Sequence, residues 1–128
     1  MDQRMYILVN EDIKISKGKL AGQVGHAVMS YLHYGIIADL RDFQIGTYAR
    51  TLMYKVLGEF DNYMKEQKKI ILKCPQHKLE ELERTENYVV IRDKGYTQLE
   101  QNTLTCVNYG ICDVDNVPEW IKELKLYH

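Results

Sequence analysis

Long apolar runs are missing from this chain of 128 residues, and so are several patterns that would define a class of protein. No run approaches the roughly 20 apolar residues of a membrane helix, so we expect no contact with a membrane. The first four residues, Met1 to Arg4, lack the layout of a signal peptide. The three cysteines form no C-x-x-C pair, and Cys74 and Cys106 lie in apolar, strand-like runs that predict buried free thiols. These absences favour a reducing, cytoplasmic setting and argue against a metal site.

Neither sign of charge dominates the composition. Seventeen Lys and Arg residues stand against eighteen Asp and Glu residues, for a net charge of −1. This balance excludes a uniformly basic nucleic-acid coat, but it leaves room for a local basic patch where Lys14, Lys17 and Lys19 cluster. Because the chain has no repeat, low-complexity segment or linker, we expect residues 1–128 to form a single domain with one core.

Four short apolar runs are typical of strands, and they alternate with segments of helical spacing. The expected strands are Met5–Val9, Ile70–Cys74, Tyr88–Ile91 and Leu104–Tyr109. The expected helices are Lys17–Tyr34 with Ser16 as N-cap and Gly35 as stop, Tyr48 to about Gln67, His77 to about Asn87, and Glu119–Leu124 after Pro118, with Asp115 or Asn116 as cap.

Alternation of strands and helices predicts an α/β fold in which a sheet is covered on both faces, a three-layer α/β/α arrangement. Right-handed crossovers predict that the first three strands are largely parallel. The connection over residues 93–103 has no room for a helix, so the last strand should run antiparallel to the third. We therefore expect a mixed four-stranded sheet whose last strand is antiparallel.

The most informative segment is residues 17–27, which follows the first expected strand. A strand that turns through a basic, glycine-containing loop into a helix brings backbone N–H groups and Lys side chains to one spot, which suits a phosphate. At about 100° per residue, the helix aligns an amine, an amide, an imidazole and a hydroxyl on one polar stripe. The stripe comprises Lys19, Gln23, His26, Ser30 and His33. Apart from His33, which we expect to be surface only, the stripe predicts a face built for chemistry.

A second candidate segment follows the third strand. Ligands in open α/β sheets bind beyond the carboxyl ends of the strands. In this chain the first expected strand leads to Lys19 and the third leads to Asp93. If these strands are parallel neighbours, the two side chains can form an ion pair in the opening beyond their carboxyl ends, which we call the mouth of the site. The Asp could then orient a water or keep the ammonium aimed at a substrate oxygen. The alternative is a purely structural ion pair or a solvated turn.

Hydroxyl, aromatic and imidazole groups flank the same mouth. Thr97 and Thr105 could donate to a developing oxyanion, although Thr is also favoured in strands for its shape alone. Tyr96 could stack on a terminal base or a ribose. Gly95 predicts a turn. His26 could act as a general base near neutral pH, although a His on a helix is more often a packed side chain.

With these segments in view, the sequence resembles the type II peptidyl-tRNA hydrolases of archaea and eukaryotes. The resemblance rests on four blocks that follow in order over nearly the whole chain: DIKISKGKLAGQVGHAV, KKIILK, DKGYTQLEQNTLTC and LKLY. It implies a mixed four-stranded sheet with helices on both faces and, often, a homodimer. It also implies hydrolysis of the ester that joins a peptide to the 3′ ribose of tRNA, without a metal or a cofactor.

By motif position, the resemblance implies that Lys19, Asp93 and Thr105 are catalytic. Lys19 would bind phosphate or stabilise the oxyanion, Asp93 would orient Lys19 or the attacking water, and Thr105 would help to hold that water. The resemblance also implies substrate binding by Lys17, Gly18, Gln23, His26, Gly95, Tyr96 and Thr97.

The chain departs from the family pattern near the second motif. Lys94 stands where the family has a small residue, and Tyr96 replaces a basic residue. Two other functions therefore remain open. One is a non-catalytic module that uses the same mouth for an RNA end or a protein partner. The other is hydrolysis of a related small acyl or aminoacyl ester.

Overall fold

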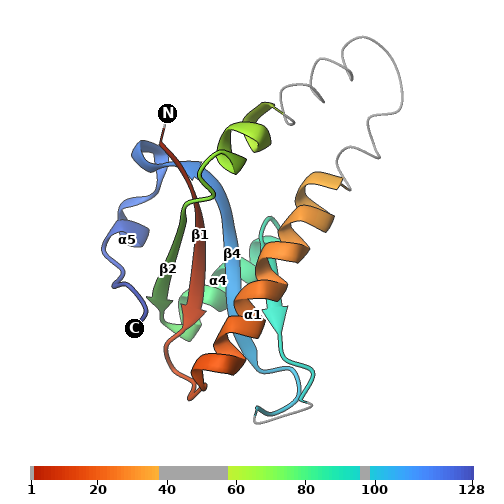
Figure 1. The fold of residues 1–128 in the computed structure, drawn as a ribbon. Helices are drawn as coiled ribbons and strands as arrows, with labels where there is room; N and C mark the ends of the chain where they lie inside the picture. The colour runs from red at the N-terminus through yellow and green to blue at the C-terminus, as the bar shows by residue number, and fades with distance from the viewer. Residues whose placement is uncertain (1, 38–57, 96–98) are drawn as a thin grey trace.

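The computed structural model describes residues 2–37, 58–95 and 99–128 (Figure 1). Within these residues, four strands form one sheet in the order β2-β1-β4-β3. The strands are β1 (Gln3–Asn10), β2 (Lys69–Cys74), β3 (Val89–Arg92) and β4 (Leu104–Asp113). Strand β1 is parallel to β2, and β4 is antiparallel to both β1 and β3. The first three strands therefore share one direction and the last opposes them, which confirms the predicted mixed sheet.

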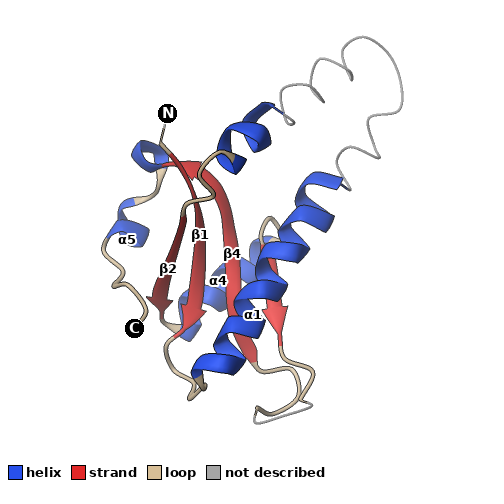
Figure 2. Cartoon of the chain, in the orientation of Figure 1, coloured by secondary structure: helices blue, strands red, loops and turns tan. Residues whose placement is uncertain are grey.

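Helices cover both faces of the sheet (Figure 2). Helix α1 (Lys17–Ser30) and its continuation η1 (Tyr31–Ile37) lie on one face, and α4 (Gln76–Thr85) and α5 (Glu119–Lys122) lie on the other. Side chains alternate along β1, so Ile7 packs in the core beneath α1 while Leu8 packs in the core with Leu79 of α4 and Ile121 of α5. The three-layer α/β/α arrangement is thus confirmed.

Helix α1 begins where the sequence predicts and continues further than predicted. Ser16 has an extended backbone, and its Oγ accepts a hydrogen bond from the Lys19 N–H at 3.2 Å. Gly35 was expected to end the helix, and this prediction is wrong because the chain passes through it as the π-helix η1. Packing of η1 against β3 overrides the weak helix propensity of a single glycine.

The ends of the shorter helices also differ from prediction. Helix α4 begins at Gln76, whose backbone N–H is capped by Asp12 Oδ2 at 2.8 Å, and it gives way to a left-handed Glu86. Asp115 and Asn116 do not cap α5, because Pro118 is its N-cap. Asp115 and Asn116 instead belong to a short 3₁₀ turn, η2 (Val114–Asn116), which the side chain of Asp113 caps.

The helix predicted from Tyr48 to about Gln67 lies only partly within the described residues. Residues 58–64 are helical, and residues 48–57 lie outside the described part of the chain. None of the described helices is long and apolar enough to cross a membrane.

Candidate active site

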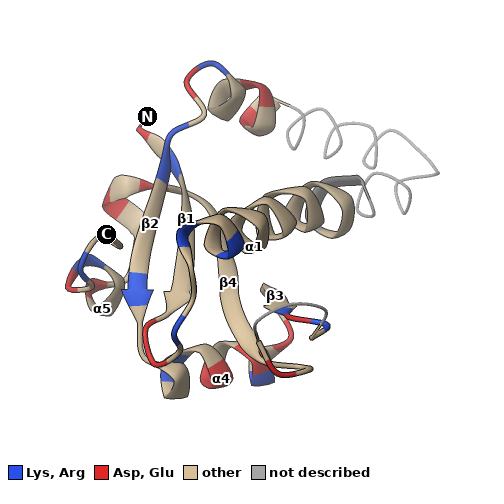
Figure 3. Cartoon of the chain, turned by 60° about the horizontal axis from the view of Figure 1, so that its bottom comes forward, with Lys and Arg blue, Asp and Glu red and all other residues tan. Residues whose placement is uncertain are grey.

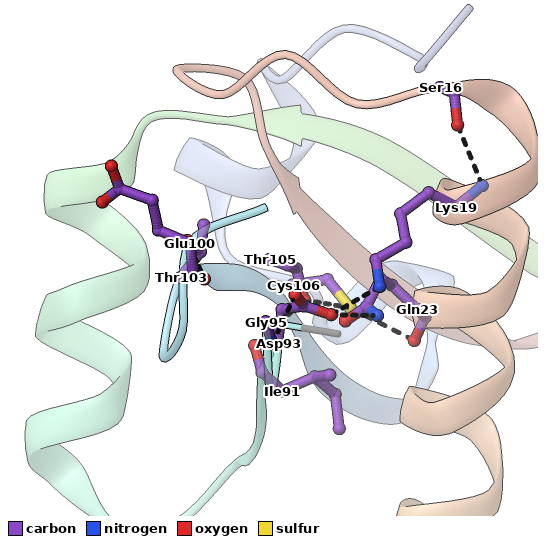
Figure 4. A network of polar contacts seen from close by, with 10 residues as sticks. All are labelled: Ser16, Lys19, Gln23, Ile91, Asp93, Gly95, Glu100, Thr103, Thr105 and Cys106. Atoms are coloured by element: carbon purple, nitrogen blue, oxygen red, sulfur yellow. Dashed lines mark hydrogen bonds and ion pairs between the residues drawn. The ribbon is translucent and has the colours of Figure 1, made fainter. Parts of the chain in front are cut away.

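The ammonium of Lys19 and the carboxylate of Asp93 meet beyond the end of β3 (Figure 4). Lys19 Nζ lies 2.6 Å from Asp93 Oδ1, and the two side chains are 16% and 4% exposed. The condition set for this ion pair, that β1 and β3 be neighbours, is not met, because β4 lies between them. The pair forms across this gap because α1 packs against both β4 and β3, which carries Lys19 to the far side of β4.

Three donors converge on the Asp93 carboxylate. Oδ1 accepts from Lys19 and, at 3.3 Å, from Nε2 of Gln23, while Oδ2 accepts from the backbone N–H of Gly95 at 2.9 Å. The hydrogen bond from Lys19 lowers the pKa of Asp93 below its ordinary value; burial opposes this shift, and the Gly95 N–H reinforces it. Asp93 is therefore ionised at neutral pH, and its lone pairs are largely committed to protein donors. Such a carboxylate is a strong anchor for an ammonium and a poor acceptor of a proton.

Gln23 links Asp93 to Thr105. The Thr105 hydroxyl donates to Gln23 Oε1 at 2.7 Å, with the Ile91 carbonyl as a second acceptor at 3.1 Å. Gln23 is 3% exposed and Thr105 1% exposed, so neither is freely open to solvent. Both ends of the amide are thus used inside the protein. The result is a buried polar chain from Thr105 through Gln23 to Asp93 and Lys19 (Figure 4).

A β-bulge turns Thr105 toward α1. In the pairing of β3 with β4, Ile91 lies opposite Cys106 and Arg92 opposite Leu104, so Thr105 has no partner residue. An extra residue of this kind bends a strand and re-aims its side chains. Here Thr105 and Cys106 both contact Gln23, the thiol donating to the Gln23 carbonyl with a separation of 3.6 Å.

The loop after Asp93 depends on a glycine. Gly95 has φ +79°, and a Cβ added there would lie 2.8 Å from the backbone N and Cα of Gln101. The loop is also closed by backbone hydrogen bonds between Asp93 and both Asn102 and Thr103. The prediction that Gly95 is a turn residue is confirmed. The candidate residues Tyr96 and Thr97 lie outside the described residues.

A groove of about 570 Å³ opens beside the ion pair, between α1 with η1 on one side and β3 on the other. It is lined by Lys19, Gln23, His26, Ser30, Tyr34, Val90, Ile91, Arg92, Asp93 and Lys94. Four members of the predicted stripe on α1 therefore border one space, and His26 is exposed within it. His33 is exposed and absent from the lining.

Other candidates lie outside the groove, and some lining residues were missed. Lys17 and Gly18 are exposed at the start of α1 and do not line the groove. Tyr34 and Arg92 line it without having been predicted. Tyr34 follows Ser30 at the same four-residue spacing as earlier stripe positions, so extending the stripe by one turn would have found it.

The two buried cysteines are poorly suited to act as nucleophiles. Cys74 and Cys106 are free and buried, as predicted, and burial raises the pKa of each thiol to about 12. No group of three or more His, Cys, Asp or Glu side chains suited to a metal ion occurs within the described residues.

Sequence comparisons relate this chain to proteins named peptidyl-tRNA hydrolase. The family model of the peptidyl-tRNA hydrolase PTH2 matches residues 3–127. A protein named peptidyl-tRNA hydrolase from Sulfurisphaera tokodaii is 34% identical over 98% of this chain and 99% of its own length. Proteins of the same name from Haloquadratum walsbyi and Methanococcus vannielii are 33% and 34% identical, over 94% of this chain and 96% and 95% of their own lengths.

Proposed function

The chain belongs to the PTH2 family of peptidyl-tRNA hydrolases, and on that basis we propose that it hydrolyses the ester joining a peptide to the 3′ ribose of tRNA. The observation that carries this proposal is the anchored Lys19 ammonium at the groove, 2.6 Å from a buried carboxylate. Ester hydrolysis builds negative charge on the carbonyl oxygen, and a fixed cation in a partly dry site stabilises that charge.

Lys19 acts as the electrophilic group. A water adds to the ester carbonyl carbon, and the oxygen that becomes negative is held by the ammonium. The bond from that carbon to the ribose 3′ oxygen then breaks. One proton of the water passes to the ribose 3′ oxygen and the other is released to solvent, so the products are a peptide carboxylate and a tRNA with a free 3′ hydroxyl. The same ammonium could hold a phosphate of the tRNA end, but its contact with Asp93 at the mouth of the groove favours the reacting carbonyl.

Asp93 and Thr105 act mainly as positioning residues. Three donors occupy the Asp93 carboxylate and its pKa is lowered, so orienting Lys19 suits it better than accepting a proton from water. Thr105 is 1% exposed, and its hydroxyl proton is donated within the protein. Thr105 therefore affects the reaction by holding Gln23, and through it Asp93, rather than by binding a water.

Substrate binding is assigned to the two ends of the site. Lys14 and Lys17 lie just before and at the start of α1, and Lys94 lies in the loop after β3; all three are exposed, so phosphates of the tRNA end would be attracted there. Gly18 has open space around it in the first turn of α1, where a phosphate can approach the backbone, and His26 faces the substrate from the groove. Gly95 contributes indirectly, because it sets the course of the loop after Asp93.

We further propose that residues 1–128 act as one domain in the cytoplasm, without a metal ion and as a homodimer. The free cysteines support a reducing compartment, and the Lys19 charge can supply the electrostatic stabilisation that a metal would provide. The exposed apolar side chains of Met29 and Met64, which line one apolar cavity, support self-association. Sedimentation velocity measures the oligomeric state, and activity in EDTA tests the metal.

Hydrolysis of N-acetyl-aminoacyl-tRNA tests the main proposal, with unblocked aminoacyl-tRNA as a second substrate. The wild type should release the blocked amino acid, and Lys19→Ala should lower kcat/KM by about 10²- to 10³-fold, as for loss of one stabilising group at an oxyanion. Asp93→Ala should cause a similar loss. Lys65→Ala, an exposed lysine outside the groove, is the matched control and should keep full activity.

Two other results would replace this proposal. Salt-sensitive tRNA binding without turnover would favour a non-catalytic RNA-binding module. Turnover of small acyl esters that does not depend on the tRNA would favour a general esterase.

A further inference from the structure

The groove has a charged end and an uncharged end. Lys19, Asp93 and Lys94 lie at one end, while Ser30, Tyr34 and Val90 lie beyond His26. The sequence contains no Asp, Glu, Lys or Arg over residues 20–37, which make up the rest of α1 and η1. Figure 3 shows this as a helix without charged positions after its first turn. Such a wall suits a neutral ligand, because it offers a phosphate no Lys or Arg side chain.

The opposite wall is an edge strand. Among the described strands, β3 pairs only with β4. Val90, Ile91 and Arg92 are consecutive, yet all three line the groove. Because successive side chains of a strand point to opposite faces, consecutive lining residues mean that the β3 backbone itself borders the groove. An edge strand presents N–H and C=O groups that another extended chain can pair with.

The dimensions of the groove suit a short extended peptide. Lys19 and Tyr34 are both lining residues, and at 1.5 Å per helical residue they lie roughly 20 Å apart along the axis. An extended chain covers about 3.4 Å per residue, so this length corresponds to about five or six residues. One end of that path begins at the Lys19 ammonium, where the ester would be cleaved.

We infer that the uncharged part of the groove, from His26 to Tyr34 along β3, binds the main chain of the substrate's peptide in extended form. This inference rests on the proposed function, because it assumes an ester located at Lys19. The tRNA leaves toward Lys17 and Lys94, and the peptide leaves along the uncharged wall. Peptides attached to tRNA differ in sequence but share one backbone, and addition to a strand edge recognises that backbone through main-chain hydrogen bonds.

The test compares tRNAs that carry N-acetylated alanine chains of one, two and four residues. The wild type should show kcat/KM rising about 10-fold from one residue to four. N-methylation of the peptide nitrogens should remove this gain, because a methylated nitrogen cannot donate to β3. Tyr34→Ala should lower the ratio of four-residue to one-residue kcat/KM. Met29→Ala, which is 66% exposed on the same helix and outside the groove lining, should leave that ratio unchanged.

Several results would overturn the inference. Equal kcat/KM for all three lengths, or a gain that survives N-methylation, would show that the peptide backbone is not bound along β3. A Tyr34→Ala variant that loses tRNA binding and slows every length equally would assign the groove to RNA. Absence of turnover on every substrate would instead refute the proposed function, and this inference with it.

Discussion

Replacing Thr105 by Val should separate the stability of the fold from the positioning of the site. The two side chains have nearly the same shape, so the change removes the hydroxyl that donates to Gln23 Oε1 at 2.7 Å and little else. Gln23 is 3% exposed, which leaves its oxygen buried without that donor. An unsatisfied buried acceptor costs about 1 to 3 kcal/mol of unfolding free energy.

Thr105→Ser is the matched control, because it keeps the hydroxyl and removes the methyl group. Burial of one such group contributes about 0.8 kcal/mol, and a small cavity adds to the loss, so Thr105→Ser should cost about 1 kcal/mol. The two variants therefore have overlapping expected stabilities. They differ in whether the chain from Thr105 through Gln23 to Asp93 stays intact.

Urea unfolding and kcat/KM for N-acetyl-aminoacyl-tRNA should be measured on both variants. If Thr105 holds Gln23 and thereby Asp93, Thr105→Val should lower kcat/KM by about tenfold, equivalent to about 1.4 kcal/mol of transition-state stabilisation. Thr105→Ser should stay close to the wild type. In a background of Gln23→Met, the difference between Val and Ser should disappear, because the link is already cut.

Equal activity of the Val and Ser variants would refute this reasoning and leave Thr105 with a structural role only. Loss of activity in both, in proportion to their loss of stability, would do the same. A difference between them that persists in Gln23→Met would mean that the hydroxyl acts on the reaction by another route.

Three further predictions concern the loop, the pH dependence and the core. Gly95→Ala should destabilise the fold by about 1 to 3 kcal/mol and lower kcat, because Gly95 has φ +79° and no room for a Cβ. The control is Gly22→Ala, which has open space around it and should be neutral or stabilising in urea unfolding. The pKa of Asp93 is lowered from 3.8, so its contribution to stability is complete above about pH 4 and is lost as the pH falls through the lower folded value. The stability difference between wild type and Asp93→Asn should then be constant from pH 5 to 8 and shrink below pH 4; a change centred near neutral pH would contradict this assignment. Leu79→Ala should cost about 2 to 5 kcal/mol in urea unfolding because Leu79 is fully buried, and a cost below 1 kcal/mol would contradict its place in the core.

The elements of the sheet were predictable because their signals are local. Each strand is a short apolar run, and Ser16 has the side chain that a helix N-terminus requires. Even the meeting of Lys19 and Asp93 was predicted, from the rule that functional groups gather at the carboxyl ends of strands. That prediction assumed neighbouring strands, whereas β4 lies between β1 and β3. Both side chains still lie at the end of the sheet where β1 and β3 finish, so they meet although the condition of neighbouring strands is not met.

Features that depend on register could not be predicted in this way. The bulge at Thr105 arises from the way β3 pairs with β4, and no residue pattern within Leu104–Asp113 predicts it. Asn108 is a similar case. It is 1% exposed, and its amide donates to the Ala27 carbonyl of α1 at 3.1 Å, which ties the helix to the middle of the sheet. A polar residue inside an apolar run could have signalled such a bond, but it could not have identified the partner.

Gln23 shows why a polar stripe on a helix is ambiguous. Periodicity divides a helix into polar and apolar sectors, and the polar sector is ordinarily assigned to water. On α1 that sector instead faces the polar groups of Asp93 and Thr105, so Gln23 is almost completely buried while His26, one turn further on, is exposed. A polar stripe shows only that one face of a helix contacts polar groups, which can belong to water or to the protein. On α1 these groups belong to the protein. The absence of charged residues over 20–37 distinguishes the two cases. A helix face that contacts only water is expected to carry some charged side chains, and this one carries none.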